Sequence, residues 1–187
     1  LDHIDELEAH RKEIESEILR IAEPFSAVLD LLYTLPGLNK NPMTAIAILS
    51  EIGPDMSVFP SSKHLISWAG CCPRNDQSNQ KVKSRRISRA GSYLKPLLVQ
   101  VANALIKSKK HPEFKERYHR IKSRRGHKKA IIAVCKMLLT AIWNMLSKLE
   151  PYNPEGFLEH RPVKQEKTLT VSQALELLRL RGYTIAN

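Results

Sequence analysis

The middle of this chain contains almost no acidic residues. Residues 61–130 hold 19 Lys and Arg but only Asp76, Glu113 and Glu116 as acids, which gives this basic block a net charge of +16. General acid–base pairs and Mg²⁺ or Ca²⁺ sites need grouped carboxylates, so the basic block cannot build either from its own residues. The chain also has no Gly-rich phosphate loop and no nucleophile-elbow motif.

Cysteine is scarce as well. Cys71 and Cys72 are adjacent and Cys135 stands alone, a pattern that supports neither a disulfide framework nor a zinc site. Histidine recurs every eight residues between 111 and 127, but eight residues advance about 80° beyond two helical turns, so these side chains would not share a helix face. We expect no metal site in this chain and a reducing, cytoplasmic location.

Long apolar runs are also missing. None reaches the roughly 18 residues of a membrane span, and no signal peptide is present, so we expect no membrane partner. Apolar residues make up 42% and charged residues 26%, which is typical of a folded globular chain. The first residue is Leu1 rather than Met, which suggests a fragment of a longer protein.

The charge that is present is divided along the chain. Residues 1–30 carry 3 basic and 9 acidic side chains, a net charge of −6, whereas residues 131–187 are close to neutral at +2. The whole chain sums to +11. Nucleic acid is the natural partner of the basic block between these ends, although a solvated basic face would have the same composition.

The acidic head has the pattern of a coiled-coil helix. Its nine heptad positions are apolar except for Arg11, a pattern that favours pairing of two helices. They are Ile4, Leu7, Arg11, Ile14, Ile18, Ile21, Phe25, Val28 and Leu32. Pro24 should kink or break the helix. We expect residues 1–32 to mediate homo-oligomerisation; the alternative is an amphipathic helix that packs on its own domain.

A turn-rich stretch, LPGLNKNP, follows at residues 35–42. Asn41 is a good N-cap and Pro42 suits a first helical position, so a helix should begin here and end near Gly53. A helix, a Pro-Gly turn and a second helix resemble the helix-hairpin-helix module, in which backbone amides grip phosphates. Gly37 and Lys40 are therefore candidate phosphate contacts, although such a turn is also a common structural element.

The remaining pattern is helical apart from one long basic loop. Residues 70–91 are rich in turn formers and lack helical periodicity; Val82 and Ile87 are compatible with a short strand. Helical patterns lie before this loop, after it from Ser92 to residue 149, and near 171–180. We predict an all-α bundle with domains at 1–32, 33–150 and 151–187, the last a linker and amphipathic helix.

Ser78 lies in this loop, just ahead of five cations, Lys81, Lys83, Arg85, Arg86 and Arg89. A serine hydroxyl can attack a phosphodiester where cations stabilise the developing charge. From composition alone, a loop serine is more often a turn former.

Three segments in order resemble a known family: LPGLNKNPMTAIAILSEIG, FPSSKHLISWAGCCPR and QSNQKVKSRRISRAGSYLKPLLVQVANALI. They are similar to the C-terminal domain of the DEDD-plus-serine insertion-sequence transposases, which are bridge-RNA-guided recombinases related to pilin-gene invertases. The resemblance covers about residues 30–148. The heptad helix before it resembles the coiled coil that joins the two halves of those proteins.

This resemblance implies that Ser78 is the nucleophile, with Ser84 and Ser88 as competitors, and that Arg85, Arg86 and Arg89 contact phosphates of DNA or guide RNA. It also implies Mg²⁺ bound by an N-terminal RuvC-like domain with four acids, which this chain lacks. We therefore expect this fragment alone to be inactive. Family members often have glycines after the serine, where this chain has Asn79 and Gln80.

The leading interpretation is thus the serine half of a DNA transposase that moves an insertion sequence under RNA guidance. The alternative is a non-catalytic helix-hairpin-helix module that binds nucleic acid and dimerises through its first helix. A third possibility is an oligomerisation domain whose basic face meets an acidic partner.

Overall fold

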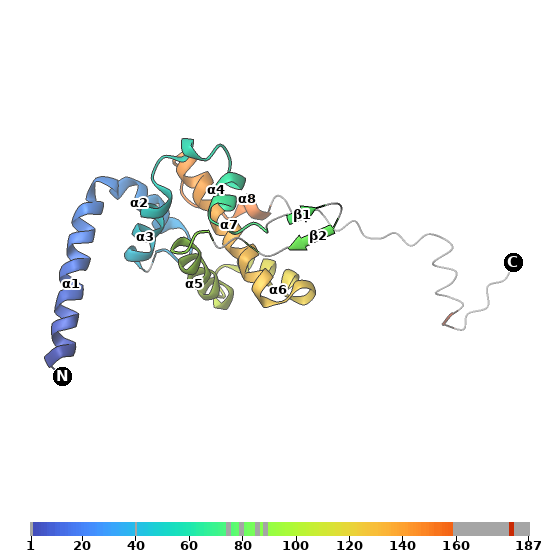
Figure 1. Cartoon of the computed structure of the whole chain (residues 1–187), viewed down its shortest axis with the longest axis horizontal. Helices are drawn as coiled ribbons and strands as arrows, with labels where there is room; N and C mark the ends of the chain where they lie inside the picture. Colours follow the sequence, from blue (N-terminus) through green and yellow to red (C-terminus); the bar gives the residue numbers. More distant parts are fainter. Residues whose placement is uncertain are drawn as a thin grey trace. The chain divides into compact units, whose positions relative to one another are not determined.

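The computed structural model describes residues 2–39, 41–73, 76–78, 81–84, 87, 90–158 and 180–181. The chain divides into two compact units, Leu1–Asn153 and Pro154–Asn187. The first unit contains the helical bundle, shown in Figure 1. The described part of the second unit includes one short helix, α8 (Glu155–Leu158). Most of the helix predicted near 171–180 lies outside the described residues.

The first unit is built from helices, as the sequence predicted. They are α1 (Asp2–Ala22), α2 (Ser26–Thr34), α3 (Pro42–Ile52), α4 (Ser62–Trp68), α5 (Leu94–Lys107), α6 (Pro112–Arg125) and α7 (His127–Lys148), with short 3-10 turns η1 (Glu23–Phe25) and η2 (Met56–Val58). A short antiparallel hairpin, β1 (Asp76–Ser78) and β2 (Lys81–Ser84), lies between α4 and α5. The all-α bundle is therefore confirmed, with one small β element in the predicted basic loop.

α7 is the central helix of the bundle. It packs against α4, α5 and α6, and its buried residues recur at helical spacing from Ala130 to Leu146. By length and composition α7 could cross a membrane, but 56% of its apolar window is buried inside the protein, as expected for a core helix. Trp143 on α7 donates its indole N–H to the carbonyl of Phe59 at 2.9 Å, which fixes the segment before α4.

The turn between α2 and α3 packs into this core. Leu35 and Leu38 are fully buried. Gly37 has φ = +89°, and a Cβ added there would lie 2.8 Å from Cγ1 of Val101 on α5. The left-handed backbone and the close approach to α5 both require glycine at this position.

The ends of α3 follow the local signals in the sequence. The side chain of Asn41 accepts a hydrogen bond from the Thr44 amide at 3.3 Å, and Pro42 is the first helical residue. The helix ends at Gly53, whose φ is +74°. The predicted cap, start and stop of this helix are confirmed.

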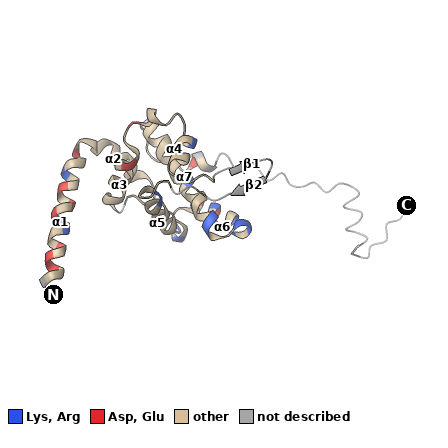
Figure 2. Cartoon of the chain, in the orientation of Figure 1, with Lys and Arg blue, Asp and Glu red and all other residues tan. Residues whose placement is uncertain are grey.

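Charge is segregated among the helices. Figure 2 shows acidic residues along α1 and basic residues gathered on α6. Glu113, in the first turn of α6, is buried and accepts a hydrogen bond from the Tyr152 hydroxyl at 3.0 Å. The Tyr152 amide in turn donates to Thr34 at 2.9 Å, so the segment after α7 is tied to both α2 and α6.

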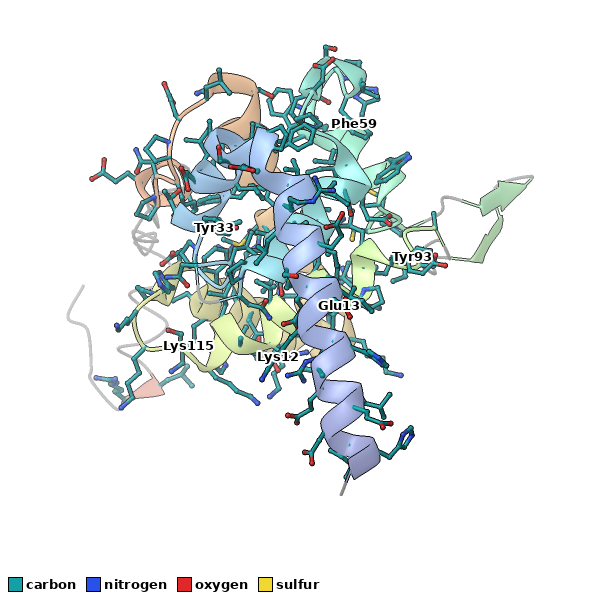
Figure 3. The ribbon with its side chains drawn as sticks, turned by 90° about the vertical axis from the view of Figure 1, so that its left-hand side faces the viewer. Lys12, Glu13, Tyr33, Phe59, Tyr93 and Lys115 are labelled. Atoms are coloured by element: carbon teal, nitrogen blue, oxygen red, sulfur yellow. The ribbon has the colours of Figure 1, made fainter. Side chains whose placement is uncertain are left out.

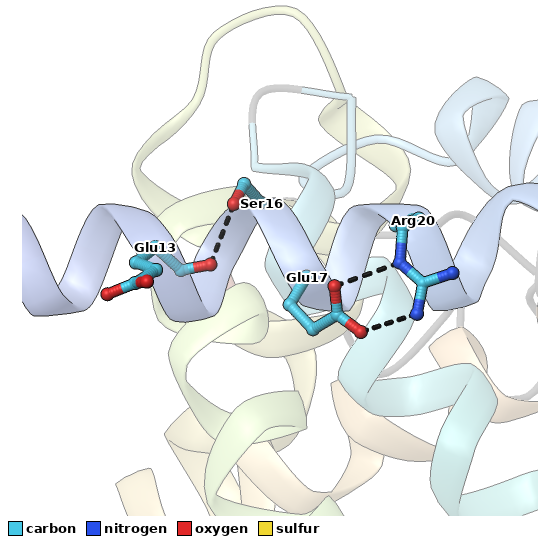
Figure 4. A network of polar contacts seen from close by, with 4 residues as sticks. All are labelled: Glu13, Ser16, Glu17 and Arg20. Atoms are coloured by element: carbon cyan, nitrogen blue, oxygen red, sulfur yellow. Dashed lines mark hydrogen bonds and ion pairs between the residues drawn. The ribbon is translucent and has the colours of Figure 1, made fainter.

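α1 exposes both its polar and its apolar side chains. Lys12 and Glu13 project from it in Figure 3, and the Arg20 guanidinium forms two hydrogen bonds with the Glu17 carboxylate, at 2.6 and 2.9 Å (Figure 4). This pair lowers the pKa of Glu17 and raises that of Arg20. The heptad residues Ile4, Leu7, Ile14 and Ile21 are each more than half exposed.

The heptad pattern continues past Pro24, but its two halves have different surroundings. η1 separates α1 from α2 at this proline, as the sequence predicted. Beyond it, Phe25 is 41% exposed and Val28 is half-buried, whereas Leu32 is fully buried where α2 packs against α3 and α7. The part of the pattern that a partner could cover therefore lies on α1 and at Phe25.

Candidate nucleic-acid interface

The β-hairpin carries the candidate nucleophile. Its two strands are antiparallel, and the register shifts between Asp76 and Gln77 as at a β-bulge. From the far end toward the bundle, the opposed pairs are Ser78–Lys81, Gln77–Val82, Asp76–Ser84 and the isolated bridge Pro73–Ile87. Ser78 therefore ends its strand directly opposite the first cation of β2.

Two glycines close the base of this hairpin. A Cβ on Gly70 would lie 2.4 Å from the carbonyl oxygen of Ala90, and a Cβ on Gly91 would lie 2.4 Å from that of Ala69. Both glycines have positive φ, +67° and +68°. The chain thus enters and leaves the hairpin through a reciprocal backbone contact in which either side chain would clash. We call Gly70 and Gly91 the glycine clasp.

A lysine and a thiol lie beside the glycine clasp. The ammonium of Lys95 would be 2.9 Å from a Cβ on Gly70. Burial raises the pKa of the Cys71 thiol, an effect that the positive charge of Lys95 partly offsets. Burial, together with Cys71, raises the pKa of Cys135 to about 12. Both buried thiols stay protonated at neutral pH and are not thiolate nucleophiles.

The structure brings together the backbones of three predicted site residues, Ser78, Lys81 and Lys83, on the hairpin. Ser84, a competing serine, lies on β2. The other predictions on the loop and turn, Arg85, Arg86, Arg89, Ser88 and Lys40, lie outside the described residues. Gly37 is half-buried against α5, so it has a packing role independent of phosphate contact, which stays a prediction.

Sequence reasoning missed the glycine clasp and Tyr93. The close approach of Gly91 to Ala69 is a tertiary contact between segments distant in sequence. The repeated Ala-Gly dipeptide, at 69–70 and 90–91, was the available signal. Tyr93 is 75% exposed just before α5 (Figure 3), and an exposed aromatic ring is a surface on which a nucleobase can stack.

The described residues do not fit a Mg²⁺ site. Among them, no group of three or more His, Cys, Asp or Glu side chains could hold a metal ion, and Mg²⁺ requires oxygen ligands such as carboxylates. The hairpin backbone places a serine at the end of β1 and two lysines on β2. That combination suits attack on a phosphodiester.

Residues 29–119 match the family model described as "Transposase IS116/IS110/IS902 family". This range contains the last six residues of α2, all of α3, α4, the hairpin and α5, and the first eight residues of α6. The match therefore includes the glycine clasp and Ser78.

Two curated proteins are similar to the chain. Pilin gene-inverting protein of Moraxella bovis is 30% identical over 125 residues, and the protein of the same name from Moraxella lacunata is 29% identical over 125 residues. In both cases the similar region covers 66% of this chain and 38% of the relative. The chain therefore spans well under half the length of these relatives. No solved structure matches it.

Proposed function

We propose that this chain is part of a transposase of the IS116/IS110/IS902 family, and that the whole protein moves an insertion sequence by cutting and rejoining DNA under RNA guidance in the cytoplasm. The match over residues 29–119 carries this proposal, because it includes the hairpin with Ser78. The two pilin gene-inverting relatives support a role in DNA transposition or recombination.

Ser78 is the nucleophile in this proposal. Its Oγ attacks the phosphorus of a DNA phosphodiester, an Oγ–P bond forms, and the bond from phosphorus to one strand oxygen breaks. The departing oxygen takes up the hydroxyl proton, and attack by another strand end later reverses the exchange. Lys81, Lys83, Arg85, Arg86 and Arg89 stabilise the negative charge that develops on the phosphoryl oxygens.

The remaining parts of the machinery lie outside this chain. Mg²⁺, when bound by an acidic RuvC-like domain of the longer protein, supplies Lewis-acid chemistry at the phosphodiester; none of the steps assigned to these residues passes through it. A guide RNA selects the target by base pairing, which explains why the chain needs phosphate contacts more than base contacts. Without the acidic domain, the 187-residue chain binds nucleic acid but does not cut it.

Self-association through α1 completes the proposal. Ile4, Leu7, Ile14 and Ile21 are apolar residues at heptad spacing, and all are more than half exposed. A second copy of α1 would bury this stripe, as in a coiled coil.

The decisive experiment replaces Ser78 in the full-length protein with guide RNA and target DNA present. We expect Ser78→Ala to abolish recombination, a loss of at least about 10³-fold, because removing a nucleophile leaves only binding and charge stabilisation. Ser84→Ala, a substitution of the same kind on the neighbouring strand, should retain activity. Strand exchange measured by junction PCR and covalent DNA–protein adducts on denaturing gels report the result.

Recombination by Ser78→Ala at the wild-type rate would end the nucleophile assignment. If the same variant still binds DNA and the wild-type protein forms no covalent adduct, the non-catalytic binding module is the better description.

A further inference from the structure

The larger group of cations in the basic block lies outside the hairpin segment. Residues 107–129 hold eleven Lys and Arg and two acids, against five cations in residues 81–89. No Asp or Glu occurs between Glu116 and Glu150. This segment spans the end of α5, all of α6 and the first turn of α7.

α6 separates its apolar and basic side chains cleanly. Phe114 and Tyr118 are buried toward the bundle, whereas Lys115, Arg117, Arg120, Lys122, Arg124 and Arg125 are all exposed. Arg117, Arg120 and Arg124 are spaced i, i+3, i+7 and therefore share one side of the helix. The pKa of Arg117 is lowered by its partial burial and by the neighbouring charge of Arg120, so these like charges lie close together.

The junction of α6 and α7 extends this surface. Gly126, with φ = +81°, separates the two helices, and the Tyr118 hydroxyl hydrogen-bonds Nδ1 of His127 at 2.8 Å across the junction. Lys128 and Lys129 follow, both exposed in the first turn of α7. The ammonium of Lys122 lies 5.4 Å from the Tyr118 ring centroid, which holds one cation beside the same junction.

Among the residues that the structure describes, none of the cations of α6 or of the first turn of α7 forms an ion pair. Lys128 and Lys129 also stand at the positive end of the α7 dipole, where cations are unfavourable. Exposed cations that form no ion pair among the described residues are suited to an external polyanion.

We propose that this α6–α7 basic corner, defined as Arg117, Arg120, Lys122, Arg124, Lys128 and Lys129, binds the phosphate backbone of double-stranded DNA without reading its sequence. The inference rests on the proposed function and adds a second contact surface to the serine hairpin. α6 is about 21 Å long, and duplex DNA carries one charge per roughly 1.7 Å of axis, so a rigid helix of this length faces a regular array of phosphates.

The test compares two double charge reversals in the 187-residue chain. Lys128→Glu/Lys129→Glu removes two cations from the corner. Lys12→Glu/Lys148→Glu changes the net charge equally but alters exposed lysines on α1 and at the far end of α7. Binding to a fluorescein-labelled DNA duplex and to the matching RNA duplex is followed by anisotropy between about 50 and 200 mM salt.

We expect the corner variant to bind duplex DNA at least about tenfold more weakly at low salt, with the slope of log K against log[salt] smaller in magnitude by about 2, because two phosphate contacts are lost. The control should stay within about twofold of wild type. Acidic residues are favourable at a helix N-terminus, so the corner variant should unfold at or above the wild-type temperature. If it does not fold, Arg120→Gln/Arg124→Gln on the exposed side of α6 replaces it.

If the corner variant binds duplex DNA with the affinity and salt slope of the control, the corner does not bind DNA, and the proposed function still stands. If the corner variant loses affinity only for the RNA duplex, the corner is an RNA-binding surface and the DNA proposal is wrong. If the wild-type chain binds neither duplex at low salt, the proposed function itself fails.

Discussion

At the residue scale, the glycine clasp controls how the hairpin leaves the bundle. Gly70 and Gly91 each face the carbonyl of the alanine that precedes the other. Two backbones approach this closely only when neither residue carries a Cβ. The clasp therefore sets the direction in which the two strands of the hairpin leave the bundle.

Gly70→Ala separates this positioning role from ordinary backbone strain. Alanine at Gly70 must adopt positive φ and also displace the Ala90 carbonyl, so we expect at least about tenfold loss of recombination in the full-length protein, as for other misplaced catalytic groups. Gly53→Ala is the matched control, because Gly53 also has positive φ but has nothing within 4 Å of an added Cβ.

Each substitution should cost about 1–3 kcal/mol from strain alone. Urea unfolding of both variants measures this shared loss of unfolding free energy. Equal recombination by both variants at equal stability would show that the clasp does not position the hairpin.

At the element scale, α1 differs from every other long helix of the first unit. Its described side chains are nearly all exposed, and only Ala22 at its end is buried. An isolated helix with a solvated apolar stripe is marginal in water, and most helical stability in proteins comes from packing of such a face. The sequence predicted this stripe, but Pro24 and the burial of α2 decide where it stops.

Ile14→Glu should disrupt self-association through α1. A carboxylate in the middle of the heptad stripe would be desolvated in a coiled coil, so we expect the dissociation constant to rise at least about 100-fold, or roughly 3 kcal/mol. The bundle should keep its unfolding midpoint because Ile14 is 61% exposed.

Leu19→Glu, an equally drastic change at an exposed α1 residue off the heptad positions, is the control. Sedimentation velocity over a concentration series measures both. A wild-type chain that stays monomeric at high concentration would refute assembly through α1.

At the scale of the whole molecule, buried ionisable groups make the first unit sensitive to alkali. Burial raises the pKa of Cys135 from 9.0 to about 12 and also raises the pKa values of Cys71 and Tyr152. A raised pKa means that the folded state keeps a proton that the unfolded chain releases. The corresponding stability is fully present below pH 9 and is lost as pH rises toward 12.

Cys135→Ala should flatten this pH dependence. The thiol of Cys135 accounts for a fall in unfolding free energy of roughly 2 kcal/mol between pH 8 and 10.5, which the variant should lack. The cavity that alanine leaves is the same at both pH values, so the difference in unfolding free energy between the two pH values reports only the titration of Cys135.

Urea unfolding followed by circular dichroism gives the unfolding free energies of wild type and Cys135→Ala at both pH values. Cys72→Ala leaves Cys135 in place, so its unfolding free energy should fall between pH 8 and 10.5 as steeply as that of wild type. Equal pH dependence in Cys135→Ala and wild type would contradict the assignment to this thiol.

The sequence by itself determined the features that depend on local periodicity and local chemistry. The helices, the cap at Asn41, the stop at Gly53, the break at Pro24 and the basic loop are each encoded within a few neighbouring residues. The excess of basic residues in the middle of the chain is also read directly from the sequence, because composition does not depend on the fold. The candidate nucleophile Ser78 rests instead on the resemblance to a transposase family, because its place ahead of the cations does not by itself predict that role.

Tertiary structure decided what depends on segments distant in sequence. The clasp joins residues about twenty positions apart, and Gly37 is fixed by its close approach to α5. The net charge of the basic block was read from the sequence. Which of its α6 cations face solvent depends on the burial of Phe114 and Tyr118 on the opposite side of the helix. Close backbone approach and the burial of one helix face arise only when the bundle packs, so no local pattern could specify them.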